Sequence, residues 1–227
     1  KPGDTVGVSA LSPAWYRVVV ESAGCTLAIG DIDAETGLLS AQEARRLHDE
    51  GAAALIIHET LGNSAVPGYY GFLDIPVIYD AAESLGSQFS NQETSGTRAI
   101  VVYAFEEHHV VSTGGGSALL CQGEPFESNS RQSLAGKRDF DLNRMTDLNA
   151  ALGLVQLATL NRQLQRRREL FDRYREALMR TRHQLFGIKD IDFQPNGQAF
   201  AVLLDSKPEL AIAFGAKYEV PVRLTFR

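Results

Sequence analysis

The chain has 227 residues, of which 44% are hydrophobic and 22% are charged, which is enough for one large domain or two small ones. Its formal net charge of −6 argues against a nucleic-acid partner, because such partners require a basic surface. No apolar run reaches the roughly 20 residues that cross a membrane, and no signal-peptide pattern is visible. We therefore expect neither a nucleic-acid nor a membrane partner.

The two cysteines indicate the compartment. Cys25 and Cys121 both lie in apolar, strand-like runs of the sequence. This placement predicts buried free thiols in a reducing cytoplasm, with a disulfide as the less favoured alternative.

The first sixty residues alternate between apolar runs and capped helices. Strands are expected at residues 5–10, 25–32 and 53–58. Ser12 and Pro13 form a helix start, with the hydroxyl as N-cap and the proline at the first helical position, and Gly24 ends that helix. Ser40 with Glu43 three residues later has the pattern of a capping box, which predicts a second helix to about residue 50.

The alternation continues through the middle of the chain. A glycine-rich connection is expected at residues 62–71, and further strands at residues 75–80, 99–105 and 118–122. Strands that alternate with helices indicate a doubly wound, mainly parallel sheet with helices on both faces. The sequence therefore predicts an α/β fold.

Beyond residue 122 the pattern changes. Residues 123–141 are polar, and apolar residues at near-helical spacing then predict the longest helix of the chain at residues 146–183. The run Arg166-Arg167-Arg168 within that helix is interpreted as a solvated face. The tail predicts a strand at residues 200–204, a short helix from residues 206–208 and a last strand.

Residues 75–118 carry the most informative pattern. A buried strand ends at Asp80 and leads into a small-residue turn, and the next strand leads into Glu106-Glu107-His108-His109. The glycines Gly114-Gly115-Gly116 follow, which either cradle a phosphate or form a flexible turn, the turn being favoured. Reactive side chains at successive strand ends are what an α/β cofactor pocket needs.

This order resembles the DegT/StrS family of sugar aminotransferases, which are fold-type I pyridoxal phosphate (PLP) enzymes. The string from Asn143 to Gly153 resembles the same family's interface helix. The resemblance implies a three-layer, mainly parallel sheet. It also implies that Asp80 pairs with the pyridine nitrogen of PLP and that Glu83 replaces a glutamine beside the cofactor. His109 falls where the family has the lysine that forms the Schiff base.

The resemblance also predicts the domain organisation. Residues 1–145 match the large α/β domain, residues 146–183 a long interface helix, and residues 184–227 the start of a small C-terminal domain that stops early. The chain thus resembles a shortened version of the family, and its interface helix predicts a homodimer or a heterodimer with a related subunit.

The phosphate anchors of the family are replaced in this chain. Ala104 stands where the family has a serine, and Leu142 where it has an asparagine, with Asn143 adjacent as a substitute. The position of the family's ring-stacking aromatic falls near Pro13, with Trp15 and Tyr16 slightly off register. A phosphate dianion requires several donors, so these losses predict that no cofactor is held.

A metal site is a minor alternative at the same place. Carboxylate and imidazole groups in residues 106–109 are good ligands, and His58 from a neighbouring strand end could join them. Adjacent residues rarely converge on one ion, so we expect no metal.

Three functions remain open, in order of preference. The first is a non-catalytic relative that serves as a dimer partner, scaffold or nucleotide-sugar-binding subunit. The second is a nucleotide-sugar 3-dehydratase in which His109 replaces the lysine and PLP or its amine form is used. The third is an ordinary aminotransferase, which would need another lysine in the pocket. The lysines are Lys1, Lys137, Lys189, Lys207 and Lys217.

Overall fold

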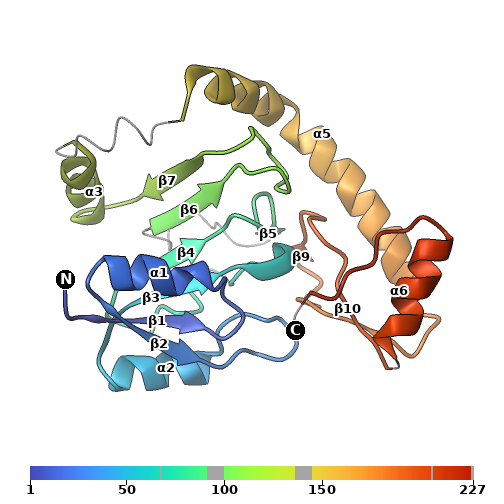
Figure 1. Ribbon diagram of the computed structural model, residues 1–227, viewed down its shortest axis with the longest axis horizontal. Helices are drawn as coiled ribbons and strands as arrows, with labels where there is room; N and C mark the ends of the chain where they lie inside the picture. Colours follow the sequence, from blue (N-terminus) through green and yellow to red (C-terminus); the bar gives the residue numbers. More distant parts are fainter. Residues whose placement is uncertain (67, 91–99, 136–144, 206, 226–227) are drawn as a thin grey trace.

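A computed structural model of the chain describes residues 1–66, 68–90, 100–135, 145–205 and 207–225 (Figure 1). Leu142 and Asn143, which the sequence singles out as phosphate-anchor positions, lie outside the described residues. Within the described part, no helix is both long enough and apolar enough to cross a membrane.

The centre of the molecule is a six-stranded sheet in the order β2-β1-β3-β4-β6-β7. Its strands are β1 (Thr5–Ser9), β2 (Thr26–Gly30), β3 (Ala52–His58), β4 (Val77–Asp80), β6 (Ile100–Ala104) and β7 (Ser117–Cys121). All neighbouring strands run parallel except β6 and β7, which pair antiparallel. The predicted α/β fold with a mainly parallel sheet is confirmed.

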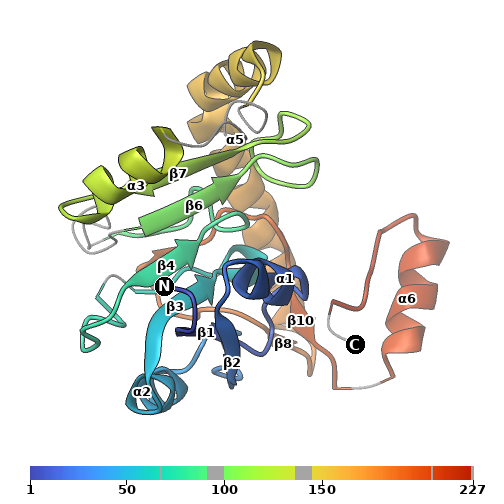
Figure 2. The same ribbon diagram turned by 60° about the vertical axis from the view of Figure 1, so that its left-hand side comes forward.

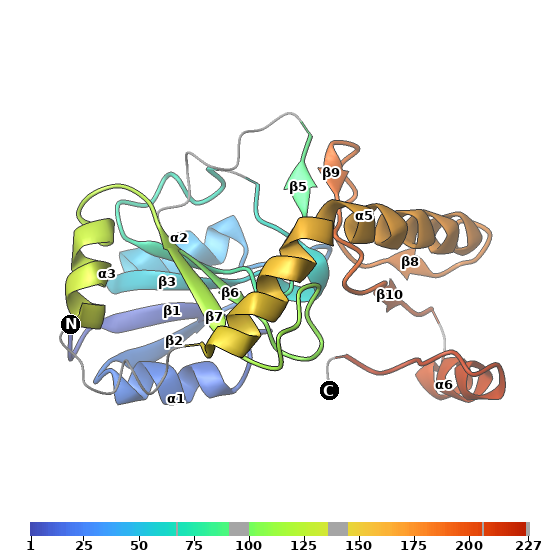
Figure 3. The ribbon, with the colours of Figure 1, turned by 90° about the horizontal axis from the view of Figure 1, so that it is seen from above.

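The first two helices cover opposite faces of this sheet. Helix α1 (Trp15–Ser22) connects β1 to β2, and helix α2 (Ala41–Asp49) connects β2 to β3 on the other side of β1. Because such crossovers are right-handed, connections that move in opposite directions place their helices on opposite faces, as Figure 3 shows. The core between α2 and the sheet includes Leu47, Leu55 and Ile57, each contributing about 1.5–3 kcal/mol by burial.

The predicted start of α1 is wrong. The helix begins at Trp15, and its N-cap is Ala14, which makes no side-chain cap. The hydroxyl of Ser12 lies 3.1 Å from the hydroxyl of Ser9 at the end of β1 instead. Residues 11–13 therefore continue the turn out of the strand, and the helix begins two residues later than predicted.

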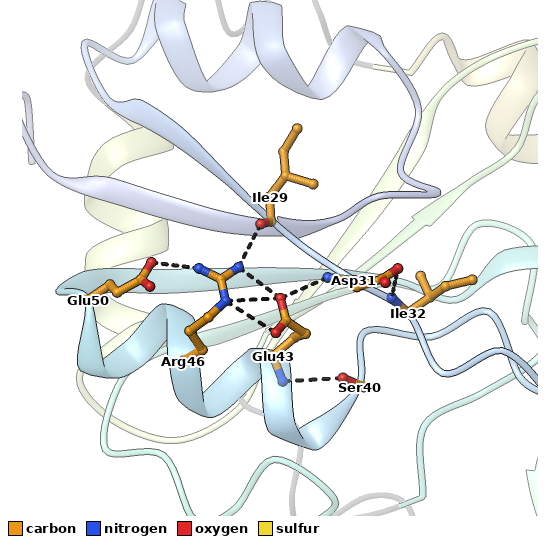
Figure 4. A network of polar contacts seen from close by, with 7 residues as sticks. All are labelled: Ile29, Asp31, Ile32, Ser40, Glu43, Arg46 and Glu50. Carbon is orange, nitrogen blue, oxygen red and sulfur yellow. Dashed lines mark hydrogen bonds and ion pairs between the residues drawn. The ribbon is translucent and has the colours of Figure 1, made fainter.

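The predicted capping box of α2 is only half formed (Figure 4). The Ser40 hydroxyl accepts from the Glu43 backbone N–H at 3.2 Å, as predicted. The Ser40 N–H, however, already donates to the Asp31 carbonyl oxygen at 3.2 Å. The Glu43 carboxylate therefore accepts from the Asp31 N–H at 3.1 Å and pairs with Arg46 at 2.8 Å.

Smaller elements complete the fold around the sheet. They are η1 (Thr60–Gly62), β5 (Gln88–Phe89), α3 (Phe126–Ala135), β8 (Gln184–Leu185), β9 (Phe193–Gln194), β10 (Val202–Leu203) and α6 (Pro208–Lys217). Strand β5 pairs with β9 and strand β10 with β8, both antiparallel. Helix α6 lies apart from the central sheet, as Figure 2 shows. The expected last strand is absent from residues 218–225, which the structure describes without strand pairing.

Helix α5 (Asp147–Leu178) is the longest element, as predicted, with 32 residues. Thr146 caps it by accepting from the Asn149 N–H at 3.2 Å. The helix ends five residues before the predicted limit at His183. A turn follows, in which the Thr181 hydroxyl and N–H both donate to the Leu178 carbonyl oxygen.

The inner side of α5 is tied to the loops at the sheet edge. Arg168 donates to the carbonyl oxygens of Gly86 at 2.8 Å and Pro195 at 3.1 Å, and Arg167 reaches that of Gly197 at 3.5 Å. The prediction of a solvated arginine run is therefore wrong for these two residues, because their donors bind loop carbonyls. Only Arg166 is exposed.

Both cysteines are free thiols, as predicted, but neither is fully buried. The Cys25 thiol donates to the Lys1 carbonyl oxygen at 3.3 Å, and the Cys121 sulfur lies 3.1 Å from the Ser130 hydroxyl. Each residue stands at a strand boundary, where neighbouring segments leave the side chain partly open.

Candidate functional site

The carboxyl ends of the central strands gather buried polar side chains. Ser9 ends β1, His58 ends β3 and Asp80 ends β4, and all three residues are less than 9% exposed. The parallel register places His58 directly beside Asp80. Because the crossovers diverge on the two sides of β1, this edge is where an α/β sheet offers a ligand crevice.

Asp80 is the centre of this cluster. Its Oδ2 accepts a short hydrogen bond from the Tyr16 hydroxyl, and its Oδ1 accepts from the Ala82 N–H at 3.1 Å. His58 Nδ1 lies 3.6 Å from Oδ2, which is within ion-pair range but too long for a hydrogen bond. Both carboxylate oxygens are therefore bonded within the chain.

The electrostatics of the Tyr16–Asp80 pair favour this closed arrangement. Burial alone would raise the pKa of Asp80, but the contact with His58 and the bonds from Tyr16 and Ala82 outweigh burial and lower it. Burial strongly raises the pKa of Tyr16, and the nearby charges of Asp80 and Glu83 add to that rise. At neutral pH a protonated phenol therefore donates to a charged carboxylate.

Sequence reasoning noticed Tyr16 only as an off-register stacking group. Tyr16 and Val20 are the two buried residues of α1, one helical turn apart, so this face of the helix packs on the sheet. The neighbouring Trp15 is 56% exposed and meets the Tyr16 ring edge-on at 4.6 Å. The sequence signal for Tyr16 was this spacing to Val20, which marks it as inward-facing.

Glu83, the other predicted cofactor-binding residue, is engaged with the backbone. Its Oε2 accepts from the Leu61 N–H. Leu61 has φ of 56°, a left-handed conformation that is unfavourable for leucine and that this hydrogen bond helps to hold. The carbonyl oxygen of Glu83 accepts from the Asn196 side-chain amide at 2.8 Å. Glu83 thus supports the turn after β3.

Glu59 is a buried acid that the sequence analysis missed. Its side chain is fully buried, one residue beyond the end of β3. Oε1 accepts from the Ser64 hydroxyl at 3.2 Å and the Ala65 N–H at 2.9 Å, and Oε2 accepts from the Ser84 hydroxyl. The carboxylate therefore joins the loops that follow β3 and β4.

His109 is half-buried in the turn after β6, at the same edge of the sheet. The ring Nδ1 accepts from the Glu106 backbone N–H at 3.1 Å, and the backbone N–H of His109 donates to the Glu106 carbonyl oxygen at 3.1 Å. Among the described residues, no hydrogen bond or ion pair joins His109 to Asp80. The ring is therefore held within its own turn, and the tautomer that this bond selects carries its proton on Nε2.

The glycine-rich segment forms a closed turn, as the favoured interpretation predicts. The N–H groups of Thr113 and Gly115 both donate to the Phe105 carbonyl oxygen, at 2.9 and 3.3 Å. Gly116 has φ of 103°, and a Cβ there would lie 2.4 Å from the Met145 Cε. The described residues contain no group of three or more acids, histidines or cysteines arranged for a metal.

Two cavities lie away from this cluster. One of about 670 Å³ lies between the end of α5, β10 and α6, with Tyr174, Phe200 and Ile212 in its wall. The other, of about 460 Å³, is lined by Phe171, Phe193 and neighbouring loop residues. Tyr16, Asp80 and His109 line neither cavity.

Comparison with known proteins decides the relationship. The model of the DegT/DnrJ/EryC1/StrS aminotransferase family matches residues 1–207. The chain belongs to this family. The UDP-4-amino-4,6-dideoxy-N-acetyl-beta-L-altrosamine transaminase of Campylobacter jejuni is 24% identical over 137 residues, 55% of this chain and 36% of the relative. EpsN of Bacillus subtilis is 27% identical over 114 residues, which are 46% of this chain and 29% of EpsN. In five curated relatives, the matched segment spans between 28% and 40% of the relative's length.

Solved structures confirm the fold of this family. The PLP form of Spr1654 from Streptococcus pneumoniae aligns with a TM-score of 0.84 at 21% identity, covering 99% of this chain and 67% of that one. DesV of S. venezuelae, in complex with a ketimine intermediate, aligns with a TM-score of 0.81 at 20% identity, and the alignment covers 95% of this chain and 62% of DesV. The predicted PLP-dependent aminotransferase type of fold is confirmed.

The residues of this DegT-family chain do not fit PLP in the manner that the family resemblance implies. Asp80 stands at the expected strand end, but its Oδ2 is bonded to Tyr16. His109 has no amine for a Schiff base, and Ala104 offers no hydroxyl to a phosphate.

Proposed function

We propose that this chain is a non-catalytic member of the DegT/DnrJ/EryC1/StrS family that acts as a dimer partner or scaffold subunit. The observation that carries the proposal is the Tyr16 hydroxyl on Asp80 Oδ2. Asp80 is the family acid that this sequence retains, and the chain itself occupies its acceptor atom. The loss of the lysine at His109 removes the covalent attachment as well.

The weakness of cofactor binding follows from the missing contacts. Each hydrogen bond to a charged group contributes about 1.5–3 kcal/mol, so the loss of two lowers affinity by about a hundredfold or more. Ala104 supplies no such bond to a phosphate. Asp80 would have to break its bond to Tyr16 before it could accept one from a ring nitrogen.

Exposed apolar side chains on the first turns of α5 support a partner role. They are Leu148, Leu152, Leu154, Val155 and Leu157. The inner side of the same helix is already bound, since Gln156 accepts from the Ser112 N–H at 3.0 Å and Leu164 is buried against Gly86. Exposed apolar side chains gathered on one helix are typical of an association surface, and a second copy or a related subunit would cover them.

The test is a titration of the wild-type protein with PLP and with its amine form, followed by near-ultraviolet absorbance. We expect no saturable change at low micromolar concentration of either compound. Tight binding of the amine form, together with dehydration of a nucleotide-linked keto sugar, would replace this proposal with the His109 dehydratase. A saturable aldimine band with amino-group transfer would replace it with an aminotransferase.

A further inference from the structure

We propose that Tyr16 is a built-in occupant of the subsite at Asp80, its phenol ring and hydroxyl standing where a ligand ring with a donor would lie. This inference deepens the proposed function and rests on it for the interpretation of Asp80. The phenol hydroxyl donates to Oδ2 of a charged carboxylate, and Asp80 is 8% exposed. A six-membered aromatic ring with one N–H or O–H donor is the class of group that this acceptor would otherwise hold.

The surroundings of Tyr16 are those of a bound ring. Its side chain is 3% exposed and lies on the buried face of α1. The His58 ring meets the Tyr16 ring edge-on at a centroid distance of 6.1 Å, and the Trp15 ring does so at 4.6 Å. The ring is enclosed by side chains from α1 and from the strand ends, so a second ring has no place beside Asp80 unless Tyr16 leaves.

The charged groups around the Tyr16 phenol explain why it stays protonated and bonded to Asp80. Asp80 lies near it at the end of β4, Glu83 in the turn that follows β4, and His58 at the end of β3. Two acids near one hydroxyl favour the protonated phenol, which is the form that donates. A buried carboxylate without that donor would be poorly compensated, because His58 stands too far away for a hydrogen bond.

The proposal predicts chemical rescue of a truncated tyrosine. The Tyr16→Ala variant would open a ring-sized space beside Asp80 and lower Tm. Added p-cresol, a free phenol, would refill it and raise the Tm of the variant by about 3–6 °C at ten times its Kd. Toluene, which has the same ring without the hydroxyl, would raise it less. Wild type and Tyr16→Phe would respond to neither compound, because their own rings fill the space.

Equal rescue by toluene and p-cresol, or no rescue by either, would overturn the proposal. If Tyr16→Ala does not fold, a double-mutant cycle of Tyr16→Phe with Asp80→Ala gives the same answer. Tyr16→Phe alone should lower the folding equilibrium constant by about tenfold to a hundredfold. That loss should vanish in the Asp80→Ala background, and its persistence there would contradict the proposal. None of these measurements uses PLP or association, so they separate a failure of this inference from a failure of the proposed function, which the PLP titration tests on its own.

Discussion

The carboxyl edge of the sheet and the outer side of α5 differ in which side chains they bury. At the sheet edge, polar groups such as Asp80 and Glu59 are buried and bonded to partners within the chain. On α5, apolar groups such as Leu148 and Leu154 are exposed, by 79% and 68%. A folded protein ordinarily buries apolar groups and keeps reactive polar groups accessible in a cleft.

The difference indicates where the chain meets other molecules. Among the described residues, Asp80 and Glu59 at the polar edge are bonded within the chain, whereas an exposed apolar surface is unfavourable in water until something covers it. This contrast supports the proposal that the chain acts through its outer surface. The following predictions test the two halves of this contrast separately.

The largest effect is expected at Glu59. Glu59→Ala would leave the hydroxyls of Ser64 and Ser84 and the N–H of Ala65 without this acceptor in a buried place. We expect a loss of about 3 kcal/mol or more in the free energy of unfolding, measured by urea denaturation. The exposed Glu107→Ala is the matched control and should change little. Equal stability of the two variants would mean that the sheet edge is not closed by internal bonds.

The next effect is a dependence of stability on pH at both ends of the scale. The pKa of Asp80 is lowered in the folded state, so its contribution is present above about pH 4 and is lost as pH falls further. The pKa of Tyr16 is raised, so its contribution is complete below about pH 10 and is lost as pH rises beyond it. Urea midpoints from pH 3 to pH 11 should fall at both ends.

The variants Asp80→Asn and Tyr16→Phe assign the fall in urea midpoint at each end of the pH range. Asp80→Asn should reduce the fall at acid pH (the acid limb), and Tyr16→Phe should reduce the fall at alkaline pH (the alkaline limb). Tyr69→Phe, which changes an exposed tyrosine, is the control and should keep both limbs. A fall in stability at high pH that is unchanged in Tyr16→Phe would contradict its assignment to Tyr16.

A smaller effect on stability and a large one on association is expected at Leu154. Leu154→Glu should change the free energy of unfolding of the monomer by less than about 0.5 kcal/mol, because the side chain is exposed. Sedimentation should show association weakened by about tenfold or more. Ile191→Glu, at a residue that is 97% exposed outside α5, is the matched control. A monomer at all concentrations for the wild type would contradict the surface role.

The smallest effect is expected in the surface network of α2. Arg46 pairs with Glu43 and with Glu50 and donates to the Ile29 carbonyl oxygen at 2.9 Å (Figure 4). These ion pairs are partly exposed at the surface, where salt screens them, so Arg46→Ala should lower Tm less than Glu59→Ala or Tyr16→Phe. This decrease in Tm should become smaller still at high salt. A decrease as large as that of Glu59→Ala would contradict the account, because a surface network would then stabilise the fold as much as the buried sheet edge.

Much of the fold could be predicted because its signals are local. Apolar runs gave the strands near their observed ends, and Ser40 and the spacing along α5 gave those helices. The start of α1 could not be predicted, because Ser12 bonds back to Ser9 rather than forward into the helix. The arginines of α5 were misjudged because their carbonyl partners, on Gly86 and Pro195, are distant in sequence.

The candidate site shows the same limit more sharply. Asp80 and His109 could be placed from motif order, since each follows a strand that ends at one edge. The partners of Asp80 could not, because Tyr16 is 64 residues away and approaches from a helix. Glu59 carried no motif, and its role depends on hydroxyls from two separate loops.

The central claim is that the Asp80 subsite is closed by the chain itself, and a His109→Lys variant tests it most directly. The variant is incubated with PLP, reduced with borohydride, and mapped for a phosphopyridoxyl group on residue 109. The account predicts no modification at that residue, and modification once Tyr16→Ala is added to the same chain. Stoichiometric modification of residue 109 in the single variant would contradict it, because the subsite would then be open with Tyr16 in place.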